Sequence, residues 1–96
     1  EHRGAVLDVG QGVLSYQDKR MELTRNESRI LQTLMEHKGA TVSRDALMRR
    51  LWDSDCFIDD NTLTVNVARL RKRLEEMGLC GFIVTRKGEG YLVEAQ

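Results

Sequence analysis

The stretch from Asp59 to Gly78 combines amide, hydroxyl and guanidinium side chains at helical spacing. Apolar residues recur in it at steps of three and four and predict the buried stripe of a helix: Leu63, Val67, Leu70, Leu74 and Met77. The opposite side begins with small polar residues and ends in a basic turn of Arg69, Arg71, Lys72 and Arg73. Amide groups can read base edges in a major groove, and cations can pair with phosphates. This pattern favours a helix that binds duplex DNA.

Two residues of the predicted helix are candidates for reading bases. Val65 stands away from the apolar stripe, where its methyl groups can pack on a thymine methyl. The carboxamide of Asn66 can form two hydrogen bonds with adenine, although an ordinary surface role is the equal alternative. A basic helix turn is in many proteins only a solvated face. Pairs of Arg71 with Glu75, or of Lys72 with Glu76, would fit that alternative.

The charge distribution also bears on DNA binding. The 96 residues carry 15 Lys or Arg and 15 Asp or Glu, so the formal net charge is zero. Nucleic-acid-binding domains usually have a basic excess, so the total argues against this function. However, residues 52–60 hold four Asp and no cation, whereas residues 61–73 hold four Lys or Arg and no acid. A local field steers a polyanion to a surface, so the neutral total weakens the DNA hypothesis only slightly.

Other classes of function have little support. No apolar run approaches the roughly 18 residues of a membrane span, and the first ten residues lack the apolar core of a signal peptide. Cys56 and Cys80 are too few for a disulfide framework, so we expect reduced thiols in a cytoplasmic protein. A zinc site of these two with His37 fits no usual spacing, and no Ser/His/Asp grouping suggests catalysis. We expect no metal, no cofactor and no enzyme activity.

The elements around the helix predict a single α+β domain. Short Val- and Leu-rich runs separated by glycines predict an antiparallel sheet over about residues 5–23. Helices are expected over about 25–38, 44–52 and 61–77, the first from a capping box of Thr24 and Glu27. Gly88 and Gly90 join two β-rich runs into a hairpin over about 82–94. A sheet, three helices and a terminal hairpin, the wing, define a winged helix-turn-helix.

Three stretches of the sequence resemble the C-terminal DNA-binding domain of OmpR/PhoB-type response regulators. They are LTRNESRILQTLMEHKGATVSRDALMRRLW and the pair DNTLTVNVARLRKRLE and IVTRKGEGYLV. The start of the third helix looks most like regulators of cell-envelope and antimicrobial-peptide stress in Gram-positive bacteria. The resemblance implies a four-stranded N-terminal sheet. It also implies transcription control by a head-to-tail pair of domains bound to direct repeats.

The resemblance places the third helix in the major groove and the wing at the minor groove or its phosphates. Together with Lys72 of the basic turn, this nominates as DNA contacts Asn61, Thr62, Val65, Asn66, Arg69, Arg71, Thr85, Lys87, Gly88 and Tyr91. Asn61 and Ala68 stand where many members carry arginine, which implies fewer phosphate contacts. Lys87 replaces the commoner arginine beside Glu89, which argues against deep insertion of the wing.

An acidic loop between the second and third helices is longer than DNA binding alone requires. In the resembled family this loop meets RNA polymerase, which implies a partner surface of Asp53, Asp55, Phe57 and Ile58. Trp52 either joins that surface or fills the gap between helix and loop. The family's receiver domain is absent from these residues, so the chain is expected to be an isolated effector domain whose sensor kinase acts elsewhere. The rival hypothesis is a winged helix used for protein–protein interaction.

Overall fold

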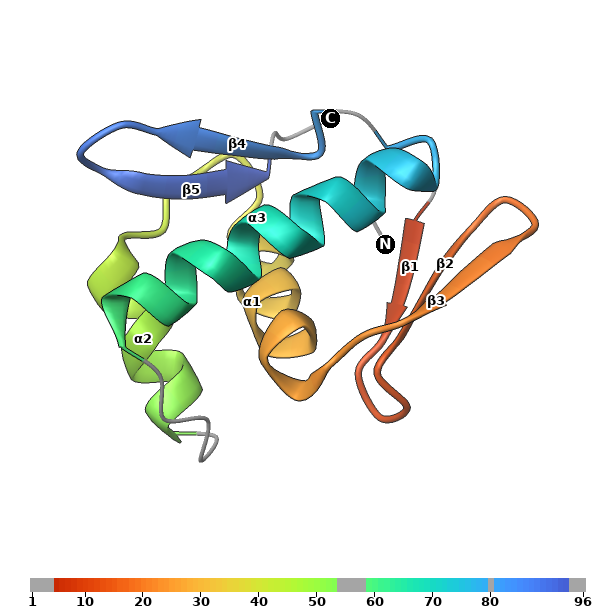
Figure 1. Cartoon of the computed structure of the whole chain (residues 1–96), viewed down its shortest axis with the longest axis horizontal. Coiled ribbons are helices and arrows are strands. Elements are labelled where there is room, and N and C mark those ends of the chain that lie inside the picture. Colours follow the sequence, from red (N-terminus) through yellow and green to blue (C-terminus); the bar gives the residue numbers. More distant parts are fainter. Residues whose placement is uncertain (1–4, 54–58, 80, 94–96) are drawn as a thin grey trace.

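The computed structural model describes residues 5–53, 59–79 and 81–93. Its three helices have a three-stranded antiparallel sheet on one side and a two-stranded antiparallel hairpin above them (Figure 1). The helices are α1 (Arg25–Glu36), α2 (Arg44–Asp53) and α3 (Asp60–Glu76). The strands are β1 (Ala5–Asp8), β2 (Val13–Tyr16) and β3 (Lys19–Glu22), followed after α3 by β4 (Ile83–Arg86) and β5 (Gly90–Val93). The predicted winged helix-turn-helix is confirmed. None of its helices, within the described ranges, is long and apolar enough to cross a membrane.

The N-terminal sheet has the strand order β1-β2-β3. Its described part therefore has the three strands that the Val- and Leu-rich runs predicted, and not the four that the family resemblance implied; residues 1–4 lie outside the described ranges. The turn between β1 and β2 is closed by a 2.8 Å hydrogen bond from Gly12 N to Asp8 O. On β3, Lys19 Nζ donates to Met77 O at 3.4 Å, where a cation suits the carboxyl end of α3.

The capping box at the start of α1 forms as the sequence predicted. Thr24 Oγ1 accepts from Glu27 N at 3.2 Å, and Thr24 N donates to Glu27 Oε1 at 2.9 Å. The Glu27 side chain is fully buried, and Arg73 Nη1 of α3 donates to the same oxygen at 2.6 Å. Arg73 also donates to the carbonyl of Glu22 on β3. One guanidinium group therefore joins β3, α1 and α3.

The hydrophobic core lies where the helices meet the two sheets. All five residues of the predicted α3 stripe are buried, and α1 and α2 contribute Ile30, Leu31, Leu34, Leu47 and Leu51. Phe82, just before β4, is the largest of the fully buried side chains. Burial of such side chains stabilises a fold by about 1.5 to 3 kcal/mol each, so this core fixes which face of α3 points outward.

The root of the wing is held by the extended link between α1 and α2. Val42 N donates to Tyr91 O at 2.8 Å, and Tyr91 N donates to Val42 O at 3.0 Å. Gly90 precedes Tyr91 with a φ of 147°. A Cβ at Gly90 would lie 2.0 Å from Val42 O, so the two backbones can approach this closely only because residue 90 is glycine.

Gly90→Ala should lower the free energy of unfolding by about 2 to 4 kcal/mol, because the new methyl group overlaps backbone atoms and φ is unfavourable for an L-residue. Gly88→Ala is the matched control. Gly88 also has a positive φ, 78°, but nothing lies within 4 Å of a Cβ added there. We expect the control to lose about 1 kcal/mol. Urea unfolding at equilibrium measures both, and equal losses would contradict the crowding at Gly90.

Candidate nucleic-acid interface

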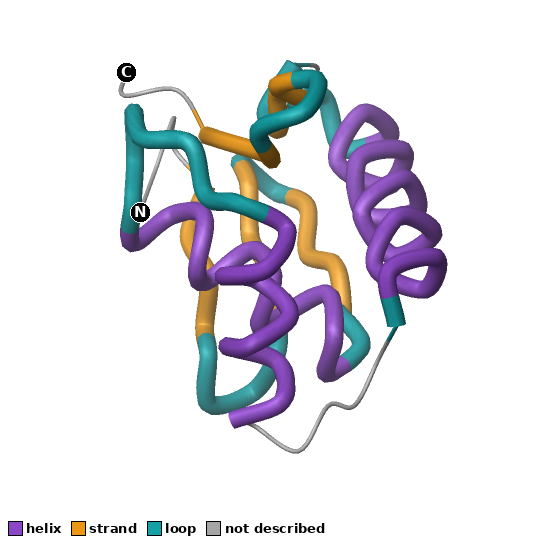
Figure 2. The backbone as a smooth tube through the Cα atoms, turned by 90° about the vertical axis from the view of Figure 1, so that its left-hand side faces the viewer, coloured by secondary structure: helices purple, strands orange, loops and turns teal. Residues whose placement is uncertain are grey.

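Helix α3 lies along one side of the molecule, with the other two helices on its inner side (Figure 2). It begins after Asp59, whose Oδ1 accepts from Thr62 N at 2.7 Å. Hydrogen bonds from the side chain and the backbone of Thr62 lower the pKa of Asp59 below its ordinary value of 3.8. The ionised carboxylate suits the positive end of the helix dipole, so the local sequence accounts for where α3 starts.

The outward face of α3 consists of exposed residues that do not pack on the core. They are Asn61, Thr64, Val65, Ala68, Arg69 and Lys72, with Thr62 partly exposed beside them. Val65 is 51% exposed, and it is one of four large apolar side chains that the described residues leave exposed. The spacing of the sequence predicted this outward position for Val65.

The expectation that Asn66 lies on the outward face is wrong. Its side chain is only 7% exposed, and Nδ2 donates to Thr62 O of the preceding turn at 2.8 Å. Asn66 follows Leu63 by three residues and precedes Leu70 by four, so helical geometry puts it at the edge of the buried stripe. That spacing was available in the sequence and could have revealed the position.

The basic turn of α3 divides between two roles. Arg69 and Lys72 are exposed on the outward face. Arg73 turns inward to Glu27, and Arg71 Nη2 donates to Thr85 Oγ1 of β4. No ion pair joins Arg71 to Glu75 or Lys72 to Glu76 within the described residues, which removes the solvated-face alternative in that form.

The wing consists of β4, β5 and their connecting turn, and the turn lies at the same end of the molecule as the start of α3 (Figure 1). Lys87 and Gly88 are exposed in the turn, and Thr85 is exposed on β4. Tyr91 differs from these predicted contacts, since it is only 6% exposed. Its ring belongs to the core, and its hydroxyl group accepts a hydrogen bond from Arg44.

Arg44, the first residue of α2, is a central residue of this region that the sequence analysis did not identify. Its guanidinium donates to Asp60 Oδ1 at 2.9 Å and to Asp60 O, Thr64 Oγ1 and Tyr91 OH, each at 2.7 Å. Its partners lie 16, 20 and 47 residues away in the sequence, so no local sequence pattern could predict these contacts. Arg44 therefore connects the starts of α2 and α3 with the wing.

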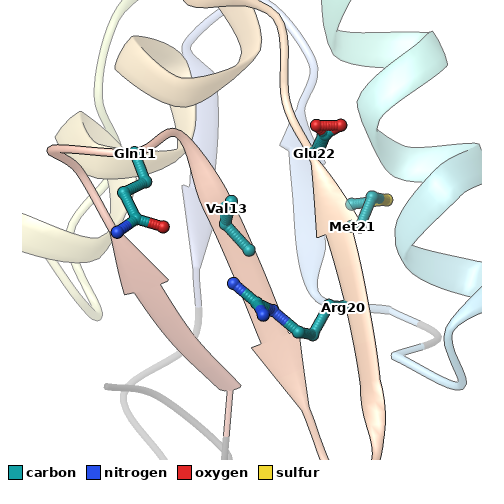
Figure 3. A pocket seen from close by; sticks show the side chains of 5 residues that line it. All are labelled: Gln11, Val13, Arg20, Met21 and Glu22. Atoms are coloured by element: carbon teal, nitrogen blue, oxygen red, sulfur yellow. The ribbon is translucent and has the colours of Figure 1, made fainter.

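Away from α3 and the wing, the surface of the described residues shows no comparable site. A hollow of about 450 Å³ on the N-terminal sheet is lined by Gln11, Val13, Arg20, Met21 and Glu22 (Figure 3). Its single cation and single acid form no cluster, and it lies at the end of the molecule opposite the wing turn (Figure 1). No group of three or more potential metal ligands occurs in the ranges that the structure describes, which exclude Cys56 and Cys80.

Comparison with known proteins agrees with this architecture. Residues 18–93 match the family model described as "Transcriptional regulatory protein, C terminal", and the chain belongs to this family of DNA-binding regulator domains. It is thus an OmpR/PhoB-type effector domain, as the resemblance indicated.

Its relatives define the subgroup. The chain is 48% identical over 91 residues to the sensory transduction protein BceR of Halalkalibacterium halodurans, covering 95% of the chain and 39% of BceR. The C-terminal domain of the lantibiotic response regulator NsrR superposes with a TM-score of 0.91 at 41% identity, covering 100% and 97% of the two chains. The RstA DNA-binding domain of Klebsiella pneumoniae, solved in complex with the RstA box, gives 0.78 at 25% identity, covering 97% and 93%. The likeness to regulators of antimicrobial-peptide stress is confirmed, and the chain spans about two fifths of the curated relatives' length.

Proposed function

We propose that this domain binds duplex DNA sequence-specifically and regulates transcription as the effector part of a two-component response regulator. The observation that carries the proposal is the outward face of α3, where Val65 is exposed beside Asn61, Arg69 and Lys72. Such a face offers apolar and amide groups to base edges, with cations beside them for the flanking phosphates. The RstA domain, a solved relative of this fold, was determined with its DNA box, which supports the same use here.

The proposed contacts follow from the positions of the side chains. Val65 packs on a thymine methyl group in the major groove, and Asn61 and Thr62 meet base edges or phosphates at the start of α3. Arg69 and Lys72 pair with phosphates along the groove. At the wing turn, Lys87 and the backbone N–H of Gly88 meet a phosphate across the minor groove. Arg71, Thr85 and Tyr91 support the interface indirectly, because Arg71 Nη2 donates to Thr85 Oγ1 and the Tyr91 hydroxyl accepts from Arg44.

Affinity for a random duplex should fall steeply as salt increases, because each phosphate contact releases counterions. Arg69→Ala and Lys87→Ala should each flatten the slope of log affinity against log salt by roughly one unit. Arg20→Ala is the matched control, since Arg20 is exposed on β3 at the opposite end of the molecule, and its slope should equal that of the wild type. Salt-insensitive binding would instead favour a protein-interaction role for the domain.

Val65→Ala should weaken binding to an operator selected from random duplexes by roughly 1 to 3 kcal/mol and change binding to a scrambled duplex much less. Asn66→Ala is the comparison at the neighbouring position. Because the Asn66 amide bonds Thr62 O inside the helix, its loss should lower the free energy of unfolding by about 0.5 to 1.5 kcal/mol. The ratio of operator to scrambled affinity should stay unchanged in that variant. Titration of both duplexes at one salt concentration measures this, and an unchanged ratio for Val65→Ala would exclude Val65 as a base reader.

The partners of the domain extend this proposal. We propose that a second copy binds head to tail on direct repeats, that a receiver domain under a sensor kinase controls the pair, and that all act in the cytoplasm, where bacterial DNA lies. Two half-sites about 10 bp apart put both copies on one side of the duplex. If two half-sites at this spacing bound no more tightly than one, the tandem arrangement would be refuted.

The acidic loop after α2 is proposed to contact RNA polymerase. Asp53 is exposed at the end of α2, whereas Asp55, Phe57 and Ile58 lie outside the described residues, and Trp52 beside them is 48% exposed. Because carboxylates repel phosphate, this loop suits a basic protein surface. Asp53→Ala combined with Asp55→Ala should leave DNA affinity nearly unchanged and lower transcription in a reconstituted assay. An equal loss of both activities would show that the loop serves DNA binding instead.

A further inference from the structure

Two arginines on different helices hold the same cross-strand pair of the wing. Thr85 of β4 and Tyr91 of β5 are directly opposite in the hairpin register. Directly opposite residues present their side chains on the same face of a sheet. Arg71 of α3 donates to the Thr85 hydroxyl, and Arg44 of α2 donates to the Tyr91 hydroxyl at 2.7 Å. Both ends of the Thr85–Tyr91 pair are therefore bound to the helices.

The guanidinium of Arg44 contacts α3 and the wing at the same time. Nη2 bonds Asp60 O and Thr64 Oγ1, Nε bonds Asp60 Oδ1, and Nη1 is left for Tyr91. Its Cζ also lies 5.9 Å from the centre of the Tyr91 ring. A rigid planar fork of donors can satisfy these partners together, which the single ammonium of lysine cannot do. This geometry couples the start of α3 to β5.

The second arginine, Arg71, acts on strand β4. β5 is bonded to the body of the domain through the backbone of Val42, but within the described residues β4 pairs only with β5. The Arg71–Thr85 hydrogen bond thus ties β4 directly to α3. Only the Arg86–Gly90 pair separates the Thr85–Tyr91 pair from the turn that carries Lys87.

We propose that Arg44 and Arg71 are positioning residues that lock the wing to α3, so that Lys87 and the outward face of α3 meet the duplex as one rigid unit. The inference rests on the proposed DNA binding. If the wing is already held in place when α3 docks, the Lys87–phosphate contact contributes its full free energy to binding. If the wing were mobile, part of that free energy would be spent on ordering it. The two arginines therefore act through the Thr85 and Tyr91 hydroxyl groups, and not through phosphate.

A double-mutant cycle tests the coupling. Tyr91→Phe with Thr85→Val removes both accepting hydroxyl groups and keeps the side-chain volumes nearly constant. Lys87→Ala then reports the contribution of the wing turn: in the wild type it should weaken duplex binding roughly five-fold at about 0.15 M salt, the value that one phosphate contact implies. In the background without the hydroxyl groups the loss should be less than about two-fold. Tyr16→Phe with Thr41→Val is the control, and it should retain the full five-fold loss.

A measurement without DNA separates positioning from folding. The NMR order parameters of the backbone N–H groups from Lys87 to Glu89 should fall when the two hydroxyl groups are removed, and should keep their wild-type values in the control. The melting temperature should change little in both. Thr85→Val alone, at an exposed strand position that valine suits, should give a smaller change of the same sign.

The possible results separate the positioning role of the two arginines from the proposed DNA binding. A five-fold loss from Lys87→Ala in every background, or unchanged order parameters, would overturn the positioning role. If Lys87→Ala had no effect in the wild type while binding stayed salt-dependent, the wing turn would not touch DNA, and the inference would fail while the proposed function stood. If the wild type showed no salt-dependent duplex binding at all, the proposed function itself would fail.

Discussion

The ion pair between Glu27 and Arg73 reinforces the orientation of α3 that the packing of its apolar stripe on the core sets. A fully buried carboxylate is costly unless charge and hydrogen bonds compensate it. Here the Thr24 N–H and the Arg73 guanidinium meet one of its oxygens, while Oε2 is buried without a hydrogen-bond partner in the described part of the chain. Rotation of α3 about its axis would withdraw Arg73 from this group. The pair therefore favours one rotational setting of the helix, and that setting decides which residues face outward.

The same helix has two surfaces because its side chains differ in length and direction. Leucines and Met77 fill the core side, and short residues such as Ala68 leave the outer side open to close approach. The long cationic side chains could reach either surface, and tertiary contacts decide which surface each one occupies. Arg73 binds the buried Glu27, and Arg71 donates to Thr85 of the wing. Arg69 and Lys72 stay exposed. The composition of α3 thus sets the possible roles of its cationic side chains, and the residues packed around α3 decide which role each one takes.

The sequence predicted the elements well because their signals are local. Helical periodicity and a capping box gave bounds within two residues of those observed for the three helices. Val65 was placed correctly for the same reason, and Asn66 was misplaced because it lies at the border between the two faces. Arg44 and Arg73 could not have been assigned in this way. Their partners lie up to 51 residues away, and only the assembled core brings those partners within reach.

The inward use of two arginines has a consequence for how such a regulator would search a genome. Arg44 and Arg73 add to the cation count of the chain, yet both are neutralised by carboxylates within the fold. On the proposed mode of binding, few positive charges face the phosphates, and affinity for arbitrary DNA depends on their number. A single domain would leave random sites quickly. The time it spends at any position would then be governed by base contacts and by a neighbouring copy, so that occupancy concentrates at paired operator sites.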